Sequence, residues 1–186
     1  DLLCTKGVDG GMDSIIIWEG DAENSGFTLT WSAHELDGIG GIHAVDMDSD
    51  GDIDFLSAHF NQDVLNWYEN DGSENFNTHI VSNEDTTGPG SRSVTPIDLD
   101  SDGNMDIVFA SAEGLFWAEN DGDESFTHNT IATISEDDQI NFVRGGDINN
   151  DGNIDLVTRR RNWGTDYNAI SWYQNNGNEV FTEYSL

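Results

Sequence analysis

One nine-residue pattern recurs in this chain at nearly constant spacing, and it limits the possible folds more than any other feature. It reads DMDSDGDID at 46–54, DLDSDGNMD at 98–106 and DINNDGNID at 147–155. A second pattern follows each copy and places Trp nine residues before Phe, in WYENDGSENF (67–76), WAENDGDESF (117–126) and WYQNNGNEVF (172–181). Self-similarity with a period of about 50 residues indicates an array in which one small structural unit is repeated.

A fourth, partial copy lies at the start of the chain. WEGDAENSGF at 18–27 keeps the Trp–Phe interval without a complete acidic loop before it. Asp155 precedes Trp172 by 17 residues, and Asp1 precedes Trp18 by the same 17. Asp1 therefore matches the ninth loop position, and we expect the chain to begin inside a structural unit. The single domain predicted for residues 1–186 then divides into a partial unit 1–45 and the units 46–97, 98–146 and 147–186.

Each unit has the pattern of four short strands. In the second unit we expect them at about 41–46, 53–59, 64–69 and 76–81, where β-branched and aromatic residues are bounded by Gly, Asn and Asp. NDG and NNG between Trp and Phe predict hairpins with type I′ turns. Four antiparallel strands per repeat predict an all-β fold, a β-propeller segment of about four blades. The recurring Trp and Phe are expected to pack one blade on the next.

The acidic loops hold closely spaced carboxylates and no Lys or Arg that could neutralise them. Side chains at positions 1, 3, 5 and 9, with the carbonyl of position 7, offer the oxygen ligands that Ca²⁺ takes, and glycine at position 6 permits a sharp turn. Mg²⁺ is less favoured because it keeps several waters, and Zn²⁺ prefers His or Cys, which the loops lack. An acidic, solvated turn is the alternative. Three in-register copies favour calcium.

The same residues carry a resemblance. DxDxDGxxD between strands, followed by WYENDG and an aromatic residue, resembles the FG-GAP/VCBS repeat family over essentially the whole chain. Members form calcium-binding β-propellers, often with seven or eight blades, and include the integrin α-subunit head and fungal lectins. The resemblance implies metal-ligand roles for Asp46, Asp48, Asp50, Asp52 (through its carbonyl) and Asp54; for Asp98, Asp100, Asp102, Asn104 and Asp106; for Asp147, Asn149, Asp151, Asn153 and Asp155; and for Asp1. Carboxylates at positions 1, 3, 5 and 9 number four, four and three along the chain, so we expect calcium affinity to fall toward the last loop.

The charge limits the partners. The chain has 37 acidic and 6 basic residues, a net charge of −31, which argues against nucleic acid because its phosphates are bound by cationic surfaces. No apolar stretch approaches the ~18 residues of a membrane span, so no membrane insertion is predicted. Free Ca²⁺ is scarce in the cytosol, so we expect a secreted or cell-surface location. The single Cys4 rules out an internal disulfide.

A basic cluster is the candidate ligand site. Arg159, Arg160 and Arg161 are consecutive, and Trp163 and Tyr167 lie outside the repeated aromatic pattern. Arginine forks suit carboxylate or sulfate, and a Trp outside the core can stack on a sugar ring. An acidic or sulfated glycan, or the acidic loop of a partner protein, would fit this cluster. The alternative is that the arginines only balance the acidic surface of the protein itself.

These features together predict an extracellular calcium-binding propeller module for recognition or adhesion, which binds a glycan or a protein. Two alternatives remain: a structural subunit of a surface assembly, and an accessory propeller of a secreted polysaccharide-degrading enzyme. The five histidines, including His43 and His59, share no register, and no G-x-S-x-G motif occurs. We therefore expect no catalysis by this chain itself, and we expect further blades, from missing sequence or from a partner chain, to complete a larger propeller.

Overall fold

The computed structural model is all-β and forms four antiparallel sheets, of which the first has three strands and the others four. It describes residues 2–6, 13–21, 26–36, 38–73, 75–83, 92–123, 125–135, 137–162 and 168–186. Within these residues no helix is present, hence none long and apolar enough to cross a membrane. This architecture confirms the predicted all-β fold.

Each sheet is a meander of strands that are consecutive in the chain. Sheet 1 contains β1 (Leu2–Lys6), β2 (Asp13–Asp21) and β3 (Gly26–Leu36). Sheet 2 contains β4 (Ile39–Val45), β5 (Asp54–His59), β6 (Val64–Asn70) and β7 (Phe76–Ser82). Sheet 3 contains β8 (Ser93–Ile97), β9 (Asp106–Ala110), β10 (Gly114–Asn120) and β11 (Phe126–Thr133). Sheet 4 contains β12 (Asp138–Gly146), β13 (Asp155–Asn162), β14 (Asn168–Asn175) and β15 (Phe181–Ser185).

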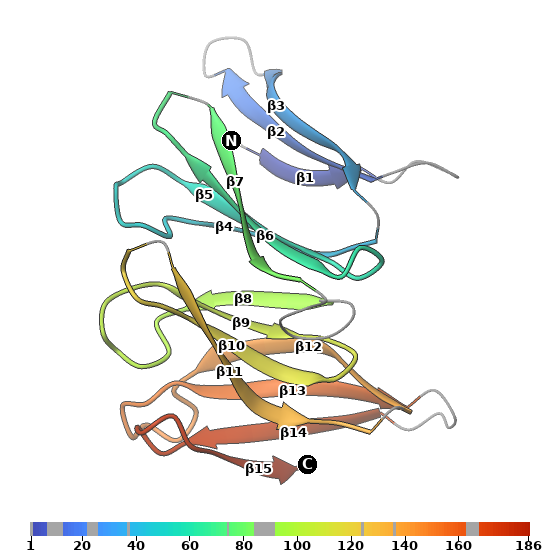
Figure 1. Cartoon of the computed structure of the whole chain (residues 1–186), viewed down its shortest axis with the longest axis vertical. Helices are drawn as coiled ribbons and strands as arrows, with labels where there is room; N and C mark the ends of the chain where they lie inside the picture. The colour runs from blue at the N-terminus through green and yellow to red at the C-terminus, as the bar shows by residue number, and fades with distance from the viewer. Residues whose placement is uncertain are drawn as a thin grey trace.

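The sheets stack face to face in chain order, with sheet 1 and sheet 4 at opposite ends of the molecule (Figure 1). The first strands β4, β8 and β12 lie next to one another, as the inner strands of propeller blades do. Each acidic loop connects the first strand of a four-stranded sheet to the second. The stack is therefore a β-propeller segment in which every acidic loop occupies the same place in its blade.

Apolar cores fill the spaces between consecutive sheets. Trp67 is 1 % exposed and belongs to one cluster with Phe109 and Phe116 of sheet 3. Trp117 is also 1 % exposed and packs with Ile140 and Tyr173 of sheet 4. These two recurring Trp residues hold one blade on the next, as predicted, and burying such a side chain is worth about 2–3 kcal/mol.

The middle strands β5 and β9 are buried at every residue, whereas the outer strands β7 and β11 are partly exposed. A strand with a sheet against each face loses water on both sides, which explains the apolar run in DIVFA. In DFLSAH, Asp54, Ser57 and His59 are buried as well.

The connection after the Trp strand differs from the prediction. β6 and β7 do form a hairpin, but residues 71–75 lie between them, and of these only Gly72 has a positive φ, 70°, among the described residues. A type I′ turn needs positive φ at two adjacent residues. The loop is instead closed by Asp71 N donating to Asn75 O at 3.0 Å and by Ser73 N donating to Asp71 Oδ1 at 2.8 Å.

Candidate metal centres

The acidic loops share one backbone conformation. Position 4 is left-handed in all three, at Ser49 (φ 62°), Ser101 (67°) and Asn150 (60°). Position 6 is glycine with φ of 98° at Gly51, 98° at Gly103 and 91° at Gly152. A Cβ added at any of these glycines would meet nothing within 4 Å, so the backbone conformation and not crowding requires glycine. The three loops are therefore three copies of one structure.

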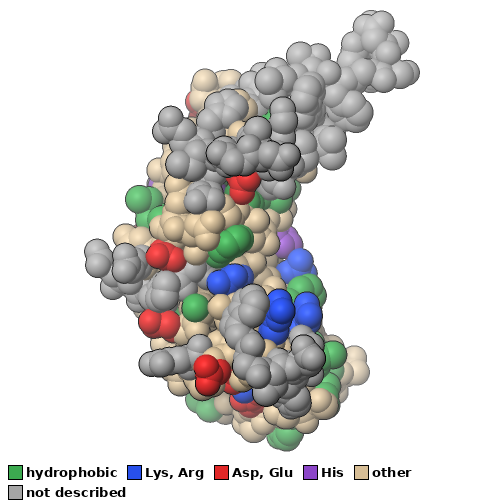
Figure 2. All heavy atoms as spheres, turned by 90° about the vertical axis from the view of Figure 1, so that its right-hand side faces the viewer, with side chains coloured by type: hydrophobic (Ala, Val, Ile, Leu, Met, Phe, Trp, Pro, Cys, Tyr) green, Lys and Arg blue, Asp and Glu red, His purple; other side chains and the backbone are tan. Residues whose placement is uncertain are grey.

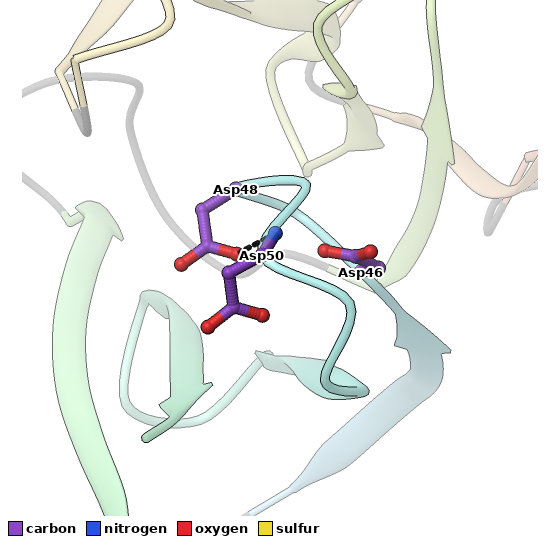
Figure 3. Close-up of side chains that lie close together, drawn as sticks. All are labelled: Asp46, Asp48 and Asp50. Atoms are coloured by element: carbon purple, nitrogen blue, oxygen red, sulfur yellow. Dashed lines mark hydrogen bonds between the residues drawn. The ribbon is translucent and has the colours of Figure 1, made fainter. Parts of the chain in front are cut away.

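The 46–54 loop brings three carboxylates together. Asp46, Asp48 and Asp50 each offer one oxygen, and these oxygens lie within 4.8 Å of one another. Figure 3 shows Asp48 and Asp50 next to each other with Asp46 across the turn. The loop backbone binds one oxygen of each: Gly51 N donates to Asp46 Oδ2 at 3.2 Å, and Asp50 N and Asp52 N donate to the other two carboxylates. The remaining Oδ1 of Asp46 is buried and has no hydrogen-bond partner.

The ninth position, Asp54, fastens this loop to the third strand. Its carboxylate accepts hydrogen bonds from Met47 N at 2.9 Å, Asn70 N at 2.8 Å and Trp67 Nε1 at 3.1 Å. The side chain is only 1 % exposed. Sequence reasoning treated Trp67 as core and gave Asn70 no role, although Asn follows each Trp of the complete units by three residues. That constant interval is the signal that could have identified the Asn.

The 98–106 loop gathers a different set. Its oxygens within 4.8 Å of one another belong to Asp98, Asp100 and the buried Asp106. Asp102 is absent from this set because both of its oxygens accept hydrogen bonds from Asn104, whose N and Nδ2 each lie at 2.7 Å. As in the first loop, the Oδ1 of the first Asp, here Asp98, is buried without a hydrogen-bond partner.

The 147–155 loop satisfies its oxygens internally. Asn149 Nδ2 donates to Asp151 Oδ2 at 2.8 Å, and Asp151 N donates to Asp147 Oδ1 at 3.1 Å. The oxygen that stays unpartnered in the other two loops therefore has a donor here. Within the described part of the chain, this loop contributes no group of three His, Cys, Asp or Glu side chains with ligand atoms close together. The side-chain amide of Asn149, at position 3, thus donates a hydrogen bond to a carboxylate oxygen that a cation could otherwise bind.

The protonation equilibria show the same difference between the loops. Burial raises the pKa of Asp106 to about 6, against the hydrogen bonds that lower it. Burial, and after it the neighbouring carboxylates, raise the pKa of Asp48 and of Asp100. In the last loop, by contrast, hydrogen bonds from Asn153 and Asn149 lower the pKa of Asp151. A bound cation would stabilise the charged carboxylates in the first two loops and reverse the upward shifts.

The donor chemistry of the first two loops fits calcium. The candidate donors are carboxylate and carbonyl oxygens, and neither loop contains His or Cys. Hard oxygen donors from one flexible loop are what Ca²⁺ takes. In addition, each loop presents one buried carboxylate oxygen without a proton donor. Asp1, the candidate of the partial unit, lies outside the described residues.

The arginines predicted as a ligand site do not share one surface. Arg159 and Arg161 are exposed, whereas Arg160 pairs with Glu183 at 2.9 Å and with Asp138 at 3.9 Å. Neighbouring residues of a strand point to opposite faces, so Arg160 lies on the other side of β13. Figure 2 shows Lys and Arg side chains gathered on the lower half of one side of the molecule. Trp163 and Tyr167 fall outside the described residues.

The face of sheet 4 that carries Arg159 corresponds to a buried face in the two preceding sheets. Arg159 is opposite Phe142 and Ile170. Ile170 is 51 % exposed, whereas Leu115, its equivalent in sheet 3, is fully buried. We call this surface, formed by Phe142, Arg159, Arg161, Ile170 and Trp172, the open face.

A cavity of about 290 Å³ lies between the 46–54 loop and sheet 3. The loop contributes residues 47–50 to its lining, and Trp67 lies beside them. The next blade contributes Asn104 from its acidic loop, Asn120 from the end of β10, and Gly122 and Asp123 from the following turn. Apart from Met47, Gly122 and the buried Trp67, the lining consists of hydrogen-bonding side chains.

Stacked four-stranded sheets with an acidic nine-residue loop after each first strand define a repeat protein of the β-propeller class. The FG-GAP-like repeat model matches residues 46–109 and again residues 98–158. The chain therefore belongs to the FG-GAP-like repeat family. No curated protein gives a significant match.

Among solved structures, the chain is similar to an Agrocybe aegerita lectin described as recognising non-reducing terminal N-acetylglucosamine. The TM-score is 0.58 at 16 % identity. The match covers 95 % of this chain and 49 % of the lectin chain, so this chain spans about half of the lectin's length. At this level of identity the similarity shows the fold.

Proposed function

We propose that this chain is an extracellular, calcium-binding β-propeller module that recognises glycans. The observation that supports calcium most directly is the pair of buried oxygens, Asp46 Oδ1 and Asp98 Oδ1, that have no hydrogen-bond partner. A buried carboxylate oxygen without a partner costs free energy. A divalent cation removes that cost and cancels the repulsion between neighbouring carboxylates. Calcium loops of this kind are filled at the concentrations found outside cells.

Calcium titration by calorimetry, combined with thermal denaturation, tests this proposal. We expect tighter binding at the 46–54 and 98–106 loops than at 147–155. For each site, calcium at about 100 times its Kd should add about 2.7 kcal/mol to the free energy of unfolding. Asp48→Asn and Asp100→Asn should weaken binding, whereas Asp71→Asn, an acidic residue outside the loops, should not. A melting temperature that is the same in calcium and in EDTA would contradict the proposal.

The glycan half of the proposal is supported by the fold shared with a lectin and by the cavity beside the 46–54 loop. The hydroxyls of a sugar can bond to the carboxylates and amides that line this cavity, among them Asp48 and Asn104. The lining combines residues of the 46–54 loop with Asp123, which lies in the turn after β10 of the next blade. A site built from two blades depends on their stacking, which calcium in the adjoining loop would stabilise.

A glycan array probed in calcium and again in EDTA tests sugar recognition. Asp123→Ala should reduce binding at the cavity. Asn178→Ala is the matched control, because Asn178 holds the equivalent place in the turn after β14. Binding that is equally lost in both variants, or absent in calcium, would contradict a site at this cavity.

The open face supports a second element of the proposed function, which is packing against a further sheet of the same repeat type. Ile170 keeps the apolar character of the buried Leu65 and Leu115 although it is 51 % exposed. Arg159 stands where Ala58 and Ala110 stand in sheets 2 and 3.

Paired substitutions test this packing. Leu115→Ala should cost about 2–5 kcal/mol in this chain, whereas Ile170→Ala should cost little until the partner sheet is present. If Ile170→Ala is also neutral when a partner sheet is supplied, the open face is not an interface. A structural subunit would be indicated by ordered polymers built through this face. An accessory role would be indicated if a protein that contains this propeller together with a catalytic domain degrades a polysaccharide. His59, one of the histidines considered as a catalytic residue, is fully buried.

A further inference from the structure

We propose that Asn120 is a positioning residue that couples the calcium loops of two neighbouring blades, so that filling the 98–106 loop tightens binding at the 46–54 loop. The inference rests on the proposed calcium function and concerns how two of its sites communicate. Asn120 ends β10 in sheet 3, and one of its bonds crosses to sheet 2.

Asn120 is held firmly to its own loop. Its backbone N donates to Asp106 Oδ1 at 2.9 Å, and its side-chain Nδ2 donates to Met105 O at 3.1 Å. Asp106 is one of the three carboxylates that come together in the 98–106 loop. A cation that draws Asp106 inward therefore also fixes the place of Asn120.

The second amide proton of Asn120 reaches the neighbouring blade. Nδ2 donates to Met47 O at 3.3 Å, in a buried bond between residues 73 positions apart. Met47 stands between the candidate ligands Asp46 and Asp48, and its own N donates to Asp54 Oδ2 at 2.9 Å. The bond from Asn120 thus holds the loop backbone between two ligands of a different site.

Both polar atoms of the Asn120 side chain have partners within the protein. Its amide provides two protons, both used, and its Oδ1 accepts from Gly122 N at 3.0 Å. The residue is 6 % exposed, so the orientation of its side chain is fixed by protein groups and not by water. When a cation at the 98–106 loop orders Asp106, it also orders Asn120 and, through the bond to Met47 O, the backbone of the 46–54 loop. The second cation then binds a loop that is already ordered, at a smaller cost in conformational entropy.

The other two sheets provide internal comparisons. Asn70 and Asn175 occupy the equivalent place and donate their backbone N to Asp54 and Asp155 in the same way. Asn70 Nδ2 donates to Ile53 O of its own sheet. Within the described residues, neither Asn bonds to the loop of another blade. The coupling should therefore join the 46–54 and 98–106 loops and leave the 147–155 loop independent.

Calcium calorimetry on four proteins tests the coupling: wild type, Asp100→Asn, Asn120→Ala and the double variant. With Asn120 present, Asp100→Asn should weaken the 46–54 site about fivefold, the size of a modest coupling between sites. With Asn120→Ala, the 46–54 site should bind equally whether Asp100 is intact or replaced. Asn70→Ala is the matched control, because it removes the equivalent bonds within one sheet and should leave the fivefold dependence in place.

Circular dichroism in EDTA shows which variants fold. Asn120→Asp provides a second test: it keeps an acceptor for Gly122 N but replaces the two donors with a charged oxygen, and Asn70→Asp, which adds the same charge, is its control. If wild type binds no calcium, the proposed function is wrong and this coupling is wrong with it. If wild type binds calcium at both loops but Asp100→Asn leaves the 46–54 affinity unchanged, only the coupling is wrong. An equal loss of coupling in Asn70→Ala would also overturn the role of Asn120.

Discussion

Asp54→Ala tests whether the ninth loop position builds the loop independently of any cation. The Asp54 carboxylate is 1 % exposed. It accepts hydrogen bonds from Met47 N at 2.9 Å, from Trp67 Nε1 at 3.1 Å and from Asn70 N at 2.8 Å. Alanine removes the acceptor of all three donors at once, and the Met47 and Trp67 donors are in buried bonds.

The magnitude follows from those donors. A buried group that loses its only partner costs about 1–3 kcal/mol. Two buried donors and a partly buried third predict a loss of about 3–6 kcal/mol in the free energy of unfolding, measured in EDTA. Asp50→Ala is the matched control, because its exposed carboxylate accepts a single exposed bond, from Asp52 N at 2.8 Å. Its cost in EDTA should stay under about 1 kcal/mol.

Urea denaturation followed by the fluorescence of the six Trp residues measures both variants. In saturating calcium we expect Asp50→Ala to lose stability as well, because the cation loses a ligand. The contrast between the two substitutions is therefore large in EDTA and small in calcium. Unfolding curves of Asp54→Ala and Asp50→Ala that coincide in EDTA would refute a structural role for the ninth position.

Three further predictions concern the backbone and the interior. Gly51→Ala, at φ 98°, should destabilise the protein by about 1–3 kcal/mol, whereas Gly146→Ala, which also meets no neighbour, should not; thermal denaturation compares them. Ser49→Asn should raise the urea midpoint slightly, because Asn tolerates the left-handed conformation that Asn150 adopts at φ 60°. Burial lowers the pKa of His59 from 6.5 to about 4, so in this window the unfolded chain binds a proton that the folded chain does not, and stability falls as the pH falls. The urea midpoint of the wild type should be lower at about pH 5 than at about pH 7, and His59→Asn should make this decrease smaller.

The positions of the strands could be predicted from the sequence because turn residues bound each of them. The main difference in sheet 2 is the start of β4, which begins at Ile39. Ile39 pairs with His59 beyond a bulge, and a Cβ added at Gly40 would lie 2.5 Å from the carbonyl oxygen of Arg92. Contact with the next sheet thus extends the strand. A pattern read within one repeat cannot contain that information.

The grouping of carboxylates within each candidate metal centre depends on more than the repeat pattern. The sequence predicts the same ligand positions in every loop, and this stays a prediction; in the structure Asp50 belongs to the first group of carboxylates, whereas Asp102 lies outside the second. The cause is position 7. Asn104 has an amide that occupies Asp102, whereas Asp52 has none to donate. Competition for oxygens among neighbouring side chains depends on geometry that the repeat pattern does not specify.

The two sequence patterns recur together because they form two halves of one structure. Asp54 binds the backbone of Asn70 at 2.8 Å, which fixes the turn after the Trp strand to the acidic loop. A Cβ added at Gly72 in that turn would lie 2.5 Å from Asp52 Oδ2. Glycine is needed there for close approach as well as for its positive φ of 70°. The turn that follows the Trp strand therefore packs against the acidic loop. We expect substitutions that disrupt one of these two segments to change the backbone conformation of the other.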